Sequence, residues 1–149
     1  SLGHRGTVNA VAITPDGKQA LSASNDQTLK LWDLATGSEL TTLFGHRGKV
    51  FAVAITPDGK QAVSASADET LKLWDLAKGK ELATFRGHSE EVYAVAITPD
   101  GKQAISASWD ETLQLWDLST GVALFRYYGW ANALAITPDG KQAIYASDD

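Results

Sequence analysis

Runs of apolar residues, some alternating with polar ones, divide residues 8–44 into four short segments. None of them keeps the 3.6-residue period of a helix, so each is predicted to be a β-strand. The segments are VNAVAIT (8–14), QALSAS (19–24), TLKLWDL (28–34) and SELTTLF (38–44). The connections PDGK and ATG contain the proline and glycine that favour tight turns. We therefore predict one small antiparallel sheet of four strands.

The same phrases return along the chain at a nearly constant interval. Two dipeptides recur 42 residues apart, GH at Gly3, Gly45 and Gly87 and WD at Trp32, Trp74 and Trp116. ITPDGKQA occurs four times, with a last interval of 39 residues. The chain thus holds three units, about 3–44, 45–86 and 87–128, and a half unit, 129–149. Such sheets are apolar on both faces and must stack, so residues 1–149 are expected to form one all-β domain.

Composition and charge narrow the classes of partner. The chain of 149 residues has 44% apolar and 21% charged residues, which is typical of a globular domain. A net charge of −5 favours neither nucleic acid nor an anionic membrane as partner, and no membrane-length apolar run occurs. Without cysteine the redox compartment stays open, with the cytoplasm favoured. Because the sequence starts with serine and lacks methionine, we expect an excised or processed piece.

Through GH, SxSxD, TLKLWDL and the 42-residue period, the whole chain resembles the WD-repeat family of β-propellers, in a highly regular form similar to bacterial arrays. The resemblance implies blades of four antiparallel strands around a channel, and a partial ring of about 3.5 blades in this chain. It also implies one hydrogen-bonded set of His, Ser, Asp and Trp in each full blade. The sets are His4, Ser22, Asp26 and Trp32; His46, Ser64, Asp68 and Trp74; and His88, Ser106, Asp110 and Trp116.

The chemistry of these sets favours a structural role. An indole N–H only donates, a carboxylate only accepts, and Ser and His do both, so the order Trp, Ser, His, Asp satisfies every member. Ser, His and Asp also form hydrolytic triads, but no GxSxG motif accompanies them and active sites are few per protein. A hydrolase is therefore the weakest alternative. The histidines lie in different units without further ligands nearby, so neither a metal nor another cofactor is expected.

Candidate recognition residues are those that differ between the copies, because the repeated positions mostly serve the blade. In the family, three of the variable positions face the mouth of the channel, and aromatic residues there are typical anchors of protein interfaces. We name these residues the rim surface and expect proteins or peptides as ligands; packing on neighbouring loops is the alternative. The rim surface consists of Asn9, Asn25, Lys49, Phe51, Glu91, Tyr93 and Trp109.

The number of copies bears on assembly. Propellers usually need about four to eight blades, so three and a half blades are not expected to close alone. Two chains joined head to tail in a homodimer would cover both open ends by two-fold symmetry. One alternative is that the missing blades belong to a longer parent chain. Another is a duplicated or engineered piece that only builds a ring and has no specific ligand.

The last copy is altered in a way that fits its truncation. Trp130 stands at the histidine position, Tyr145 replaces the strand serine, and no further WD strand follows. Without that strand, a histidine and a serine would have no indole N–H to bind. Two aromatic residues instead offer apolar surface to a neighbour. We expect Trp130 and Tyr145 to form an assembly end where another subunit docks.

Overall fold

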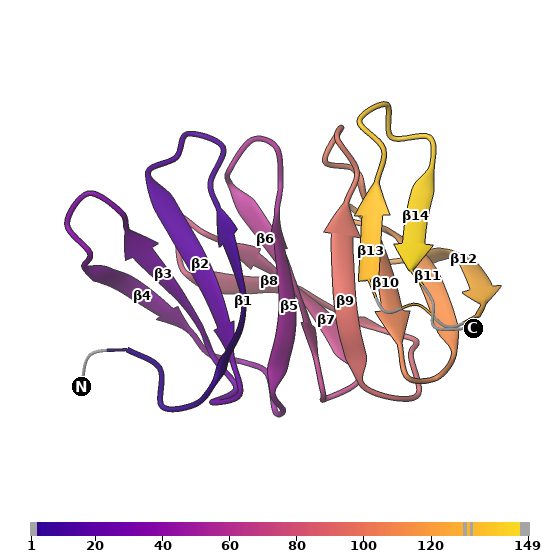
Figure 1. Ribbon diagram of the computed structural model, residues 1–149, viewed down its shortest axis with the longest axis horizontal. Helices are drawn as coiled ribbons and strands as arrows, with labels where there is room; N and C mark the ends of the chain where they lie inside the picture. Colours follow the sequence, from indigo (N-terminus) through magenta and orange to yellow (C-terminus); the bar gives the residue numbers. More distant parts are fainter. Residues whose placement is uncertain (1–2, 130, 132, 147–149) are drawn as a thin grey trace.

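The computed structural model describes residues 3–129, 131 and 133–146, with the backbone alone for 133, 145 and 146. Within these residues, fourteen strands form four separate antiparallel sheets, each with its strands in chain order. The predicted all-β class with four-stranded blades and a half blade is confirmed. In Figure 1 the sheets stand side by side from the N-terminal to the C-terminal end of the chain.

The strand bounds follow the repeat closely. Blade 1 contains β1 (Val8–Ile13), β2 (Gln19–Ser24), β3 (Leu29–Asp33) and β4 (Glu39–Leu43). Blade 2 contains β5 (Val50–Ile55), β6 (Gln61–Ser66), β7 (Thr70–Asp75) and β8 (Lys80–Arg86). Blade 3 contains β9 (Val92–Ile97), β10 (Gln103–Ser108), β11 (Thr112–Asp117) and β12 (Ala123–Tyr128). The half blade is the hairpin of β13 (Ala133–Ile136) and β14 (Ala143–Ala146).

The PDGK turns close the first hairpin of every blade. In blade 1 the hydroxyl of Thr14 donates to the carboxylate of Asp16 over 2.7 Å, and the Lys18 amide donates to the same oxygen. Gly17 has a φ of +71°, which glycine adopts without steric cost. The Thr14 hydroxyl also lowers the pKa of the Asp16 carboxyl. The same bond recurs at the other three turns, so this tetrapeptide closes the first hairpin in every copy.

The core lies between neighbouring blades. Between blades 1 and 2, Leu29 and Leu43 are buried in one cluster with Trp74. Between blades 2 and 3, the ring of Phe85 stacks on Trp116 with centroids 5.7 Å apart and planes inclined by 17°. Each blade thus covers the strand tryptophan of the blade that follows it. Because one sheet cannot bury its own faces, this stacking supplies most of the apolar burial.

The two end faces of the stack are open. Val11 and Ile13 of β1 are 61% and 60% exposed, whereas their equivalents in blade 2, Val53 and Ile55, pack against the first core cluster. At the other end, Tyr127 of β12 is 53% exposed, although its equivalent Phe85 is 1% exposed. The half blade makes its main described contacts with the inner strands β9 and β10 of blade 3. The outermost strand of blade 3, β12, therefore carries uncovered apolar side chains.

Candidate functional site

The hydrogen-bonded set of blade 2 runs through three side-chain bonds. The indole N–H of Trp74 donates to Oγ of Ser64 over 2.8 Å. The Ser64 Oγ and His46 Nε2 are 2.6 Å apart, and His46 Nδ1 is 2.7 Å from a carboxylate oxygen of Asp68. A carboxylate only accepts, so Nδ1 carries the proton and Nε2 accepts from the serine hydroxyl. The structure thus brings the four residues together in the order Trp, Ser, His, Asp.

Blades 1 and 3 repeat this arrangement, at distances of 2.6 to 2.9 Å. They differ in burial: Trp74 and Trp116 are buried, whereas Trp32 is only half-buried. Trp32 lies in blade 1, and within the described residues no sheet covers that face of the blade. The three sets therefore share one geometry but differ in access to water.

The aspartate of each set also anchors a turn. One carboxylate oxygen of Asp68 accepts bonds from the amide and the hydroxyl of Thr70, and the other accepts the amide of Arg47. Burial disfavours ionisation, but the hydrogen bonds from His46 and Thr70 more than offset it and hold the pKa of Asp68 well below its usual range. The carboxylate thus joins the histidine loop to the turn that leads into β7.

The serine of a set is poorly placed to act as a nucleophile. Ser64 is fully buried, and its oxygen already accepts the indole N–H of Trp74. A catalytic serine needs an open approach for the substrate and an accessible lone pair.

Over residues 3–129, 131 and 133–146, no group of three or more His, Cys, Asp or Glu is arranged to hold a metal ion. The described part of the chain also contains no helix long and apolar enough to cross a membrane.

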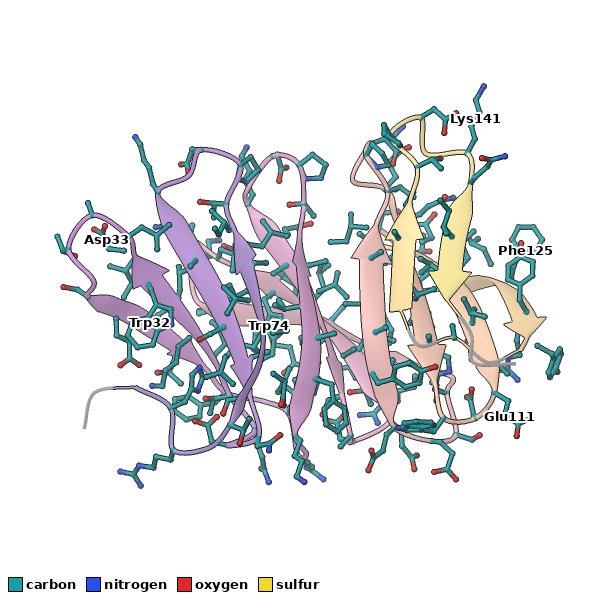
Figure 2. All side chains as sticks on the ribbon, viewed as in Figure 1. Trp32, Asp33, Trp74, Glu111, Phe125 and Lys141 are labelled. Atoms are coloured by element: carbon teal, nitrogen blue, oxygen red, sulfur yellow. The ribbon has the colours of Figure 1, made fainter. Side chains whose placement is uncertain are left out.

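The rim surface lies at the edge of the blades where β1, β5 and β9 begin. Backbone bonds bring its variable positions together, from Ala67 N to Lys49 O at 2.8 Å and from Trp109 N to Glu91 O at 3.0 Å. Trp109 is 51% exposed, Lys49 is exposed, and Phe51 and Glu91 are half-buried. This edge is the lower one in Figure 2, where Glu111 is labelled just beyond the turn that follows β10.

Some rim residues also bind the neighbouring blade, a role that the repeat pattern alone did not indicate. Asn9 donates to the Asn25 side chain at 2.7 Å and to the Val50 carbonyl at 3.0 Å. The equivalent Tyr93 donates its hydroxyl to the Ala131 carbonyl. Val50 and Ala131 occupy equivalent positions at the start of the next blade, so both bonds join successive blades. The signal in the sequence was a side chain that can donate a hydrogen bond at three of the four copies of this position, Asn9, Tyr93 and Asn132.

The aromatic part of the rim surface is concentrated on blade 3. The rings of Tyr93 and Trp109 lie with their centroids 5.0 Å apart and their planes inclined by 43°. Tyr93 also packs against the third core cluster, beneath the half blade. The predicted assembly end stays a prediction. Trp130 lies outside the described residues, and for Tyr145 only the backbone pairing with Leu134 is described.

Stability is expected to decline with acid in two stages. Burial lowers the pKa of His88 below its ordinary value of 6.5, against the opposing effect of Asp110. The unfolded chain then binds the proton more readily, so this contribution is complete above pH 6.5 and is lost as the pH falls below it. The pKa values of Asp26, Asp68 and Asp110 lie below the ordinary 3.8, so their contribution is lost below pH 3.8.

Urea unfolding midpoints between pH 8 and pH 3 measure this profile. Replacing His88 with glutamine should flatten the first decline, which starts just below pH 6.5, while the steeper one below pH 3.8 remains. A midpoint that rises between pH 7 and pH 5 in the parent protein would contradict the direction assigned to His88.

Comparison with known proteins supports the repeat. The sequence profile of the family described as "WD domain, G-beta repeat" matches residues 1–33, 37–75 and 79–117. The small ribosomal subunit protein RACK1 of Glycine max is 49% identical over 41 residues, which are 28% of this chain and 13% of that protein. The pre-mRNA-splicing factor PRP46 of Saccharomyces cerevisiae is 55% identical over 42 residues, 28% of this chain and 9% of that protein.

Each of these alignments is about as long as one repeat unit, so the stretch matched covers only a small part of either relative. The family profile, in contrast, covers most of this chain through three successive matches. Together with the four-stranded blades and the 42-residue spacing, it confirms the predicted resemblance to the WD-repeat family. The chain belongs to the WD40 repeat family and forms about three and a half blades of a β-propeller.

Proposed function

We propose that this protein is a non-catalytic scaffold that binds proteins or peptides at the rim surface. The observation that carries this proposal is the aromatic pair of Tyr93 and Trp109, because Trp109 is half exposed on a rigid blade edge. Aromatic side chains at exposed, well-supported positions are the usual anchors of interfaces. Lys49 and Glu91 lie at equivalent positions of blades 2 and 3 and add opposite charges beside them. Of the similar proteins, RACK1 is named as a small ribosomal subunit protein and PRP46 as a pre-mRNA-splicing factor.

The test must separate recognition from packing. Tyr93 binds the Ala131 carbonyl, so its loss would disturb the half blade as well as the rim. We therefore choose the double variant Phe51→Ala and Trp109→Ala, and Phe44→Ala as a matched control on an exposed aromatic outside the rim surface. Peptides selected from a displayed random library on the parent protein should bind the double variant at least about tenfold more weakly.

The control variant should retain the parent affinity for the same peptides. Equal binding to the parent and to the double variant, measured by calorimetry, would remove the rim surface from the proposal. Circular dichroism and the unfolding midpoint of each variant show whether a loss of binding reflects a loss of fold.

We further propose that two copies associate head to tail. The open face of blade 1 presents Val11 and Ile13, and the opposite end presents Tyr127 and Ile144. At the internal interfaces the equivalents of these positions in blade 2 are covered by a neighbouring blade. Two-fold symmetry covers both open ends at once, since each copy contributes one end of each kind.

Light scattering tests this association directly. The parent should have twice the mass of the 15.9 kDa chain, and Ile13→Asp should return it to one chain because a charge would be buried at the joint. Thr7→Asp, on an exposed residue just before β1, is the matched control and should remain a dimer. A well-folded parent of single-chain mass would rule out the homodimer.

A purely architectural role is the second candidate. It is favoured by the rim residues Asn9 and Tyr93, whose hydrogen bonds are used to join blades and not held free for a ligand. In that case the dimer forms, but no selected peptide distinguishes the parent from the Phe51→Ala and Trp109→Ala variant.

A further inference from the structure

An apolar groove opens beside the half blade, at the uncovered part of blade 3. It has a volume of about 530 Å³ and lies between β11 and β12 on one side and the β13–β14 hairpin on the other. Its lining includes Leu113, Leu115, Tyr127, Ile136, Lys141 and Ala143. We call it the end groove; it shares no residue with the rim surface. Figure 1 shows the half blade beside β9 and β10, with β11 and β12 extending beyond it.

The repeat shows what occupies this space elsewhere in the molecule. On the blade 3 side, three lining residues have equivalents 42 residues earlier, Leu71, Leu73 and Phe85. All three belong to the core cluster that contains Trp116, and Phe85 stacks on its ring at 5.7 Å. The blade 3 side of the end groove therefore corresponds to the surface of blade 2 that packs against Trp116.

The half-blade side of the groove has the same correspondence. Ala143 is equivalent to Ala104, which lies directly opposite Trp116 in the ladder between β10 and β11. Between blades 1 and 2 the arrangement is repeated, with Ala62 opposite Trp74. In both full interfaces the place that corresponds to the end groove thus holds the WD strand of the following blade.

Hydrogen-bonding groups for such a strand are also in position. The carbonyls of Lys60 and Lys102 each accept the amide of the leucine that follows WD, at 3.0 Å. Lys141 is the equivalent residue in the half blade and lines the groove. Within the described residues β14 pairs only with β13, so its other edge has no strand beside it. Open edges of this kind accept an added strand through main-chain hydrogen bonds.

We propose that the end groove binds an extended segment of another polypeptide with the pattern Leu-x-Leu-Trp-Asp. The segment adds to the free edge of β14, and its tryptophan lies against Tyr127 as Trp116 lies against Phe85. The same packing of a WD strand on the preceding blade is present between blades 1 and 2 and between blades 2 and 3. The end groove adds a second site to the proposed scaffold and does not depend on the rim surface. Tyr127 is also part of the proposed dimer joint, so the monomeric variant Ile13→Asp offers the groove uncovered.

The probe is a fluorescein-labelled peptide with the sequence of residues 70–86, TLKLWDLAKGKELATFR, which carries a WD strand and its hairpin partner. Anisotropy measures its binding to the parent chain and to the monomeric variant Ile13→Asp. The same peptide with alanine in place of tryptophan should bind at least about tenfold more weakly, because the aromatic anchor is lost. This comparison does not depend on the folding of any protein variant.

Two protein variants place the site. Tyr127→Ala should weaken binding of the unmodified peptide at least about tenfold. Phe44→Ala replaces an exposed aromatic that follows β4 in blade 1, and it should leave the affinity unchanged. Tyr127 is more than half exposed, so its replacement is not expected to unfold the blade. Absence of binding, equal affinity for the two peptides, or unchanged affinity of Tyr127→Ala would each overturn the proposal. Failure of the rim or dimer tests would leave these outcomes unaffected.

Discussion

Replacing Trp74 with alanine is expected to lower the free energy of unfolding by about 3–5 kcal/mol. Trp74 is fully buried between blades 1 and 2, in one cluster with Leu29 and Leu43. The substitution leaves a cavity at the interface that holds the two blades together. It also removes the donor to Ser64, at the start of the buried hydrogen-bond chain.

Trp32→Ala is the matched control within the same molecule. Trp32 donates the same bond, to Ser22 at 2.9 Å, but it is only half-buried, because no sheet in the described part of the chain covers this face of blade 1. Its loss should cost about 1–2 kcal/mol, since less packing is removed. Urea unfolding at low protein concentration measures both values. Equal losses for the two variants would contradict the view that the packing between blades supplies the difference.

The pair of tryptophan variants also bears on self-association. If the open face of blade 1 docks on a second copy, Trp32 is more buried in the dimer than in the free chain. The cost of Trp32→Ala should then rise with protein concentration, because association stabilises the folded state by mass action. No such rise is expected in the Ile13→Asp background.

The strands could be predicted nearly to the residue because their signals are local. QALSAS matches β2 as Gln19–Ser24, and PDGK marks each first turn. The predicted first strand runs one residue too far, since Thr14 uses its hydroxyl to close the turn. The predicted fourth strand, 38–44, is one residue too long at each end, because the ladder with β3 ends within Glu39–Leu43. These differences are small because alternation and turn residues act over a few positions.

The unpredicted features depend on contacts between distant residues. Gln27, Glu69 and Glu111 adopt positive φ near 70°, which their side chains do not favour. The turn holds them there because the preceding aspartate binds the threonine that follows, as Asp68 binds Thr70. Likewise, the bonds from Asn9 and Tyr93 to the next blade depend on how blades stack, which a single repeat does not reveal.

The third unit departs from the repeat at one buried position. Lys72 of blade 2 pairs with Glu81 and donates to Thr84, and Lys30 does the same in blade 1. Blade 3 has Gln114 there, fully buried, with its amide nitrogen bonded to the Gly87 carbonyl. The pattern TLxLWDL predicts the strand in either case, because the backbone ladder and the leucines define it. The change of polar partner could be read only from the structure.

Replacing Ser64 with alanine is expected to cost about 2–4 kcal/mol, somewhat less than the loss of Trp74. The Ser64 hydroxyl links the other members of the hydrogen-bonded set of blade 2. Its removal leaves the Trp74 N–H without an acceptor and His46 Nε2 without a donor. Both groups are buried, and water is poorly placed to replace the missing oxygen. Each stranded buried group costs about 1–3 kcal/mol.

Ser22→Ala is the control for access to water. It removes the same hydroxyl in blade 1, where Trp32 is only half-buried and water can take part of the role. We expect its cost to be about 1 kcal/mol, measured by urea unfolding beside Ser64→Ala. Equal costs for the two serines would mean that burial of the partners does not decide the penalty.

A double-mutant cycle tests the mechanism further. Trp74→Phe removes the indole N–H while keeping an aromatic ring in the interface, so in its presence Ser64→Ala strands one group fewer. The cost of Ser64→Ala should then fall by about 1 kcal/mol or more, since contacting residues in one network are not additive. Full additivity would show that the serine acts through packing alone. A large coupling would establish the hydrogen-bond chain as the feature that makes each blade rigid enough to present a rim and an end groove.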